Sequence, residues 1–103
     1  MKKWIILVGF LTFFMGWHTI PQAKTIKAYY YVVNVPRNDV LNIRKSPNRQ
    51  SKKVGKISRN ETCVWVVRSK RARNKRSWYK VAYRGVDGWV NSRYMRRHDG
   101  GDC

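Results

Sequence analysis

The stretch WYKVAYRGVDGWV, from Trp78 to Val90, carries the clearest structural pattern in this chain of 103 residues. From Trp78 to Tyr83, aromatic and β-branched residues alternate with polar ones, which predicts a strand with one buried face. Gly85 and Gly88 stand where a chain reversal needs a positive φ, and Arg84-Gly85 is the expected tight turn. The residues from Gly88 onward then return as a second strand. We therefore predict a compact β-hairpin in this stretch.

The residues before this hairpin supply further strand candidates. Tyr29 to Val35 is dense in strand formers and ends at the turn cluster of residues 36–39. Lys24 to Ala28 reads as a short polar leader. Leu41 to Arg44 alternates apolar with polar residues, and Cys63 to Val67 is the strongest strand pattern of the chain. Beyond the hairpin, the short charged segment up to Arg97 fits one helical turn.

Four or five short strands without a long helical pattern predict an all-β fold, a small barrel of about five strands. The barrel spans residues 29–97 in this interpretation, and residues 98–103 form a flexible tail. A domain of this size buries only about 60% of its unfolded surface, so few residues must build its core. We expect these core residues to be Val33, Leu41, Ile43, Val54, Ile57, Val64, Val66, Val81 and Val90.

Six cations crowd the segment just before Trp78, and they follow neither a strand nor a helix periodicity. Nothing in that run can line a core, so residues 68–77 are expected to form a solvated loop displayed by the hairpin scaffold. We predict that this basic loop binds a ligand through Arg68, Lys70, Arg71, Arg73, Lys75 and Arg76.

The charge balance points to the kind of partner. The formal net charge of +18 arises from 23 Lys and Arg against five Asp and Glu, and self-repulsion on that scale favours binding of an anionic partner. Three interpretations of the basic loop stay open: solvated charge, an anionic surface outside the cytoplasmic membrane, and nucleic acid. We expect an anionic cell-envelope component or an acidic protein as partner. A membrane surface is a further candidate, and a nucleic-acid-binding module is the alternative function.

The N-terminus has the pattern of an export signal. Met1 to Lys3 is positively charged, Trp4 to Met15 is apolar, and more polar residues follow. The sequence thus predicts a signal peptide over residues 1–23 and an exported protein, periplasmic or secreted. The apolar run is shorter than the roughly 20 residues of a spanning helix, and His18 and Pro21 interrupt it. Since Pro21 also makes the cleavage site imperfect, an uncleaved membrane anchor is the alternative.

Export would place the two cysteines, Cys63 and Cys103, in an oxidising compartment, where they can form a disulfide. The competing interpretation makes Cys63 a small buried strand residue and Cys103 a free terminal thiol. A metal site made of His98, Asp99 and Cys103 is a third interpretation, but a tail lacks fixed ligand spacing. We predict neither a metal nor another cofactor.

Three segments, LNIRKSPNRQSKKVGKI, TCVWVV and WYKVAYRGVDGWVNSRYM, together resemble the bacterial Src-homology-3-like (SH3) domain. That family's pattern starts with Leu-Asn-Val/Ile-Arg and a turn proline. It continues with a serine, a Val and Ile/Leu pair, Trp-x-Lys-Val-x-Tyr, a glycine turn and Gly-Trp-Val. Over about residues 31–95 the matching positions are Leu41, Asn42, Ile43, Arg44, Pro47, Ser51, Val54, Ile57, Trp78, Lys80, Val81, Tyr83, Gly85, Gly88, Trp89, Val90, Tyr94 and Met95.

This resemblance implies an SH3-like barrel that serves as an extracytoplasmic, non-catalytic binding module, often associated with wall peptides or peptidoglycan. Two features depart from the pattern. Ser46 replaces the glycine that usually precedes the turn proline, and the loop before Trp78 is longer and more basic. Because one fold hosts many binding sites, the resemblance does not name the ligand.

A second candidate site is an aromatic face made of Trp78, Trp89 and Tyr94, with Arg44 beside it. Flat amphipathic rings bind sugars and peptides at low entropic cost, but the same rings also complete the packing of a small barrel. Both interpretations stay open. The five acids are scattered and no nucleophile has an evident base, so we predict no enzyme.

Overall fold

The computed structural model describes residues 23–72, 76–99 and 103. Seven strands form a single sheet in the order β3-β2-β6-β5-β4-β1-β7, and a short 3-10 helix, Ser92–Tyr94, precedes the last strand. The all-β prediction is confirmed, with two strands more than the five expected. The strands are β1 (Ala23–Val32), β2 (Val40–Arg44), β3 (Lys53–Ser58), β4 (Val64–Arg71), β5 (Ser77–Tyr83), β6 (Val86–Asn91) and β7 (Met95–Arg97).

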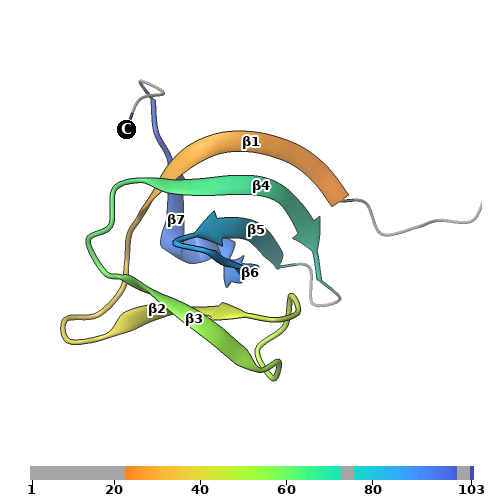
Figure 1. Ribbon diagram of the computed structural model, residues 1–103, viewed down its shortest axis with the longest axis horizontal. Coiled ribbons are helices and arrows are strands. Elements are labelled where there is room, and N and C mark those ends of the chain that lie inside the picture. The colour runs from red at the N-terminus through yellow and green to blue at the C-terminus, as the bar shows by residue number, and fades with distance from the viewer. Residues whose placement is uncertain (1–22, 73–75, 100–102) are drawn as a thin grey trace, which may run out of the picture.

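The sheet is strongly curved, as an SH3-like barrel requires. Figure 1 shows β1 and β4 arching together over one side, β2 and β3 crossing on the other, and β5 and β6 between them. All the strand pairs are antiparallel, and β5 is the central strand that pairs with both β4 and β6. This curvature brings segments far apart in the sequence to one side of β5.

The core lies inside the curve of the sheet. Six aliphatic side chains are fully buried: Ile43, Ile57, Val64, Val66, Val81 and Val90. Burying one such side chain stabilises the fold by roughly 1.5–3 kcal/mol. Tyr30, Val32, Val35, Leu41 and Met95 complete the cluster. Seven of the nine expected core residues are therefore confirmed.

Two expected core residues, Val33 and Val54, lie outside this cluster. Val33 follows the buried Val32, so its side chain points to the opposite face and is only half-buried. Val54 is an odd number of positions from the buried Ile57 on β3, and 36% of it is exposed. The prediction was wrong at these positions because apolar character alone does not say which face of a strand a residue occupies.

The hairpin predicted from residues 78–90 is confirmed. Arg84 and Gly85 form its turn with φ values of 47° and 81°, the left-handed pair that a tight two-residue turn uses. The prediction of a positive φ at Gly88 was wrong, because this residue lies inside β6 and has no positive φ. A Cβ atom there would come within 2.8 Å of the Arg44 carbonyl oxygen and would also collide with Ile43. Gly88 is needed for the close approach of β2.

The first strand starts before the expected position. Residues 24–28 belong to β1, not to a polar leader, because their backbone pairs with the far end of β4, from Ala23↔Lys70 to Thr25↔Arg68. The register shifts between Thr25 and Ala28, where Lys27 has a φ of 52°. Such a bulge adds a residue to one strand and sharpens its curvature.

The segment expected to be a basic loop starts as a strand. Arg68, Lys70 and Arg71 lie in β4, and they pair with Lys80, Trp78 and Ser77 of β5. The prediction was wrong here because β1 and β5 supply backbone hydrogen bonds on both edges of β4, whatever its side chains are. The connection between β4 and β5 is therefore shorter than the expected loop of residues 68–77. The Ala72 amide donates to the Arg76 carbonyl oxygen across it at 2.7 Å. Arg73 and Lys75 lie outside the described residues.

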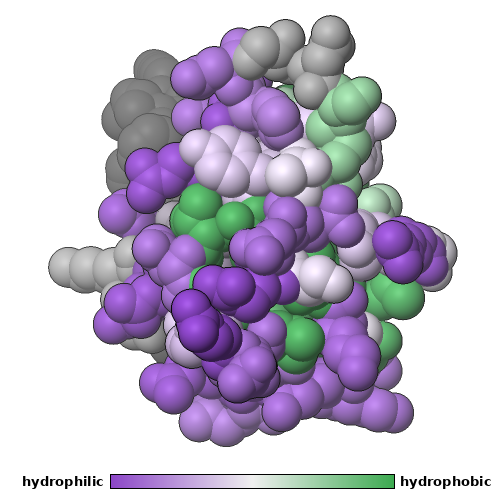
Figure 2. Space-filling view, turned by 90° about the vertical axis from the view of Figure 1, so that its left-hand side faces the viewer, coloured by the Kyte–Doolittle hydropathy of each residue, from purple (hydrophilic) through white to green (hydrophobic). Residues whose placement is uncertain are grey.

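The surface is dominated by polar groups. Figure 2 shows one face on which hydrophilic side chains cover most of the area and hydrophobic ones appear only in small patches. Among the described residues, the only large hydrophobic side chains with high exposure are Val40 and Val54. A recognition site on this surface must therefore rely on charge and shape rather than on a broad apolar area.

Candidate arginine pocket

A pocket of about 350 Å³ opens between three separate parts of the chain. Its walls come from the segment around β2, the β4–β5 connection with the start of β5, and the end of β6 with the 3-10 helix. Four arginines face one acid, so the formal charge of the lining is 4 − 1 = +3. The lining residues are Val35, Pro36, Asp39, Val40, Leu41, Asn42, Arg44, Arg49, Arg76, Trp78, Asn91, Arg93 and Tyr94.

Arg44 is fixed at the inner side of the pocket by the loop that follows β2. Its Nη1 atom donates to the Ser51 carbonyl oxygen at 2.9 Å. Two further bonds close this loop, from the Lys45 amide to the Lys52 carbonyl at 2.9 Å and from the Ser46 amide to Ser51 Oγ at 2.8 Å. An arginine held by a backbone carbonyl keeps further N–H groups for a ligand, because its guanidinium has five donors.

The 3-10 helix positions the opposite wall. Asn91 caps it by accepting from the Arg93 amide at 3.0 Å, and Asn34 Nδ2 donates to the Arg93 carbonyl at 3.2 Å. The Arg93 guanidinium lies over the Tyr94 ring, 5.7 Å from its centre. This cation–π contact holds the guanidinium over the ring, and both residues line the pocket.

The one acid of the pocket is used in a turn. The Asp39 amide donates to the Pro36 carbonyl at 3.1 Å, and Asp39 Oδ1 accepts from the Val40 amide at 2.8 Å. Its carboxylate is thus engaged with its own backbone, a common arrangement for aspartate in turns. Arg49 and Arg93, whose side chains are exposed, keep N–H donors for an external anion.

The structure brings together most, but not all, of the expected aromatic face. Trp78 and Tyr94 line the pocket with Arg44, whereas Trp89 does not. Trp89 lies under the Lys80 ammonium, 5.4 Å from its ring centre, and only 8% of it is exposed. Trp78 is 4% exposed, so it contributes an edge to the pocket floor rather than an open ring.

Sequence reasoning missed two arginines of this pocket. Arg49 follows the Ser46-Pro47-Asn48 turn, and Arg93 follows the capping Asn91. The local signals of a turn and a cap were present in the sequence. Local sequence patterns do not reveal the long-range strand pairing, and this pairing places both segments beside the start of β5. Of the expected basic loop, Arg76 lines the pocket.

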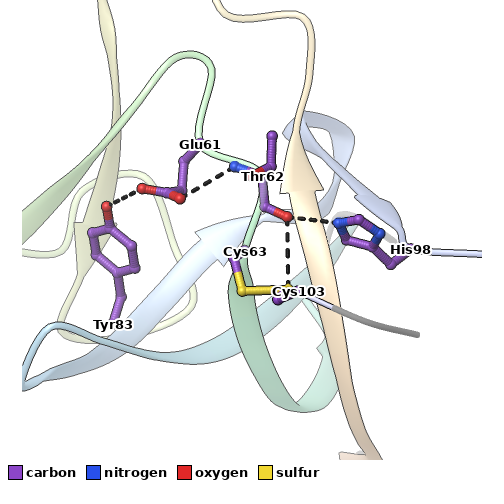
Figure 3. Close-up of a disulfide and its surroundings, with 6 residues drawn as sticks. All are labelled: Glu61, Thr62, Cys63, Tyr83, His98 and Cys103. Carbon is purple, nitrogen blue, oxygen red and sulfur yellow. Dashed lines mark hydrogen bonds between the residues drawn. A yellow bond between two sulfur atoms is a disulfide. The ribbon is translucent and has the colours of Figure 1, made fainter. Parts of the chain in front are cut away.

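Outside the pocket, a disulfide joins Cys63, just before β4, to Cys103 across 40 residues, with the Cα atoms 5.6 Å apart. Figure 3 shows that the Cys103 sulfur of this bond and the His98 ring both lie next to the Thr62 carbonyl oxygen. His98 Nε2 donates to the Thr62 carbonyl oxygen at 2.7 Å, and the Cys103 sulfur lies 3.9 Å from that oxygen. Part of the segment expected to be a tail is therefore attached to the barrel.

Next to this attachment, Tyr83 Oη donates to Glu61 Oε1 at 2.5 Å. That hydrogen bond is the main reason why the pKa of Glu61 lies below its usual value of 4.5. Burial, followed by the same bond, raises the pKa of Tyr83 above its usual value of 10.0. The pair links the end of β5 to the segment that precedes β4.

The described residues contain no group of three or more His, Cys, Asp or Glu that would suit a metal ion. The thiol of Cys103 is also unavailable to a metal, because it is part of the disulfide. No helix within residues 23–72 and 76–99 has the length and hydropathy needed to cross a membrane.

The curved sheet and the 3-10 helix before the last strand define an SH3-like barrel, and the arginine pocket lies beside the start of β5. The family model described as "Bacterial SH3 domain" matches residues 39–96. The chain belongs to this family, as its resemblance predicted, and the family consists of binding domains. Comparisons with curated proteins and with solved structures found no match.

Proposed function

We propose that this protein is a non-catalytic, exported binding module that holds an anionic component of the bacterial envelope in its arginine pocket. The observation that carries the proposal is the lining of that pocket, in which four arginines converge on about 350 Å³ with a single acid. Guanidinium groups bind carboxylates and phosphates through two parallel hydrogen bonds, which gives both strength and orientation.

The setting of the pocket agrees with this role. Bacterial SH3 domains are binding modules that often associate with the cell wall, and the N-terminal sequence predicts export. Wall peptides carry carboxylates, and other envelope polymers and lipid headgroups carry phosphates. All of these groups complement a lining of charge +3.

Co-sedimentation with a purified envelope fraction tests the proposal. The variant Arg49→Gln/Arg93→Gln removes two pocket charges at exposed side chains. Each lost contact weakens binding by roughly 1 kcal/mol, so the pair should weaken it about tenfold or more. The matched control, Arg96→Gln/Arg97→Gln, removes the same charge from exposed positions of β7 that do not line the pocket.

The two variants give a clear decision. Near-parental binding of the β7 variant together with a large loss in the pocket variant supports the proposal. Equal losses in both would mean that net charge alone attracts the protein to the envelope. Full-length protein found in the cytosol, with tighter binding to nucleic acid than to the envelope fraction, would favour the alternative function.

A further inference from the structure

The outer face of the sheet, opposite the core, carries a second set of cations that is continuous with the pocket. Residues paired across neighbouring strands share a face, and the ladder Thr25↔Arg68↔Lys80↔Trp89↔Arg44 runs across five strands. The contact of Lys80 with the Trp89 ring shows that these two side chains do lie on the same side. We call Arg44, Lys80, Arg68 and Lys70 the cationic track.

Lys70 belongs to this track because it lies two positions from Arg68 on β4 and is paired with Trp78 of β5. Trp78 and Lys80 are two positions apart on β5, so they share the outer face. All four cations of the track are half-buried, and among the described residues none of them forms an ion pair. Asp87, two positions from Trp89, is the acid nearest along this face in the strand pairing.

The placement of Arg68 opposite Lys80 is unfavourable for the sheet by itself. Like charges directly opposite each other on antiparallel strands destabilise the pairing. An anion bound over both would remove that repulsion. Charge complementarity therefore indicates that the occupant of this face is negative.

The length of the track indicates a chain rather than a small ion. Arg68 and Arg44 are three strand spacings apart, roughly 14 Å at about 4.8 Å for each interval. Arg44 also lines the arginine pocket, so it belongs to both sites. A linear molecule with repeated anionic groups can contact the pocket and the track at the same time.

The aromatic rings argue against bases as part of that chain. Proteins that bind single-stranded nucleic acid offer exposed rings on which bases stack. Along the track, Trp89 is covered by Lys80 and Trp78 is 4% exposed. The half-buried Trp65, opposite Ala82 on the same face, packs edge-on against Tyr29 with the ring centres 4.8 Å apart. The track therefore presents its cations rather than open rings, which suits a chain of phosphates without stacking groups.

We propose that the cationic track binds a linear, phosphate-bearing polymer whose end or branch occupies the arginine pocket. This inference rests on the proposed function of the pocket and adds a second contact surface to it. Binding strength then increases with chain length, because successive phosphates reach Arg44, Lys80 and Arg68 in turn.

Inorganic polyphosphate is the probe, used as tripolyphosphate and as a long chain, with affinities measured by calorimetry over a range of salt. The parent protein should bind the long chain at least about tenfold more tightly than tripolyphosphate. Arg68→Gln/Lys80→Gln should remove most of this gain and leave tripolyphosphate affinity unchanged. For this variant and the long chain, the slope of log K against log salt concentration should decrease in magnitude by about two, because each lost phosphate contact lowers it by about one.

The control variants separate the two proposals. Arg49→Gln/Arg93→Gln should weaken both probes, whereas Arg96→Gln/Arg97→Gln should keep the chain-length gain. If the parent does not bind tripolyphosphate, the pocket proposal fails. If the parent does bind tripolyphosphate, but Arg68→Gln/Lys80→Gln still binds the long chain more tightly by the same factor as the β7 variant, the track proposal alone is overturned. Tighter binding of single-stranded DNA than of polyphosphate at equal charge would also overturn it, in favour of nucleic acid.

Discussion

The two hairpins that share β5 reach the same antiparallel geometry by different means. The β5–β6 hairpin turns in two residues, Arg84 and Gly85, and its sequence alternates clearly. The β4–β5 hairpin has a longer connection and places cations along its strands, with Arg68 opposite Lys80. Turn chemistry determines the first hairpin, whereas β1 and the disulfide support the second. The far end of β4, which has no local strand signal, carries Arg68 and Lys70, two of the four cations of the cationic track.

The disulfide provides the largest expected effect on the β4–β5 side. Cys103→Ser opens a loop of 40 residues, which in the chain-entropy model costs about 4 kcal/mol of folding free energy. Denaturant unfolding of the parent with and without reductant measures this loss. Equal unfolding midpoints in both conditions would show that the β4–β5 hairpin does not depend on its covalent attachment.

The turn of the β5–β6 hairpin should be the next most sensitive feature. Gly85→Val places a β-branched residue at a φ of 81°, which should cost about 2 kcal/mol. Arg84→Ala removes an exposed side chain whose guanidinium lies 5.4 Å from the centre of the Tyr83 ring, so it should cost at most about 1 kcal/mol. Thermal melts of both variants test this difference. Matching melting temperatures would contradict the claim that turn chemistry sets this hairpin.

A smaller effect concerns the hydrogen bond between Tyr83 and Glu61, which links the end of β5 to the segment before β4. Tyr83→Phe should cost about 1 kcal/mol at neutral pH. Because the pKa of Glu61 is lower in the folded state, the carboxylate stabilises the fold above pH 4.5. This stabilisation is lost as the pH falls through the pKa that Glu61 has in the folded state. The raised pKa of Tyr83 gives the reverse dependence, a loss of stability as the pH rises above 10.0.

Unfolding of the parent and Tyr83→Phe across this pH range checks both signs. The stability difference between them should be largest at neutral pH and should shrink toward both extremes. A difference that stays constant from acid to alkaline pH would mean that the lost interaction is packing of the ring edge rather than the hydrogen bond.

The smallest predicted effect has the opposite sign. Arg68→Thr replaces a cation opposite Lys80 with a good strand former, so it should raise stability by up to about 0.5 kcal/mol. The same variant should bind long-chain polyphosphate less tightly. A destabilised Arg68→Thr variant would show that the arginine supports the β4–β5 hairpin, and this would weaken the argument that its position serves binding.

The strands with local signals could be predicted from the sequence, and the pocket could not. Alternation and the Arg84-Gly85 turn identified β5 and β6, and the apolar pattern identified the start of β4. The charged end of β4 has the sequence pattern of a loop, because its strand form depends on β1, a long-range partner. Arg49 and Arg93 were missed for the same reason, since the turn and the cap near them do not reveal what they face across the fold.

Mapping of the anion site by NMR tests the central claim most directly. On titration of the ¹⁵N-labelled protein with tripolyphosphate, the largest shift changes should occur at the Arg44, Arg49 and Arg93 amides and at the Trp78 indole N–H. The amides of Arg96 and Arg97 on β7 should change little. Changes of equal size at β7 and at the pocket would contradict the claim, because they would show that the anion binds to the general positive charge of the protein and not to a formed site.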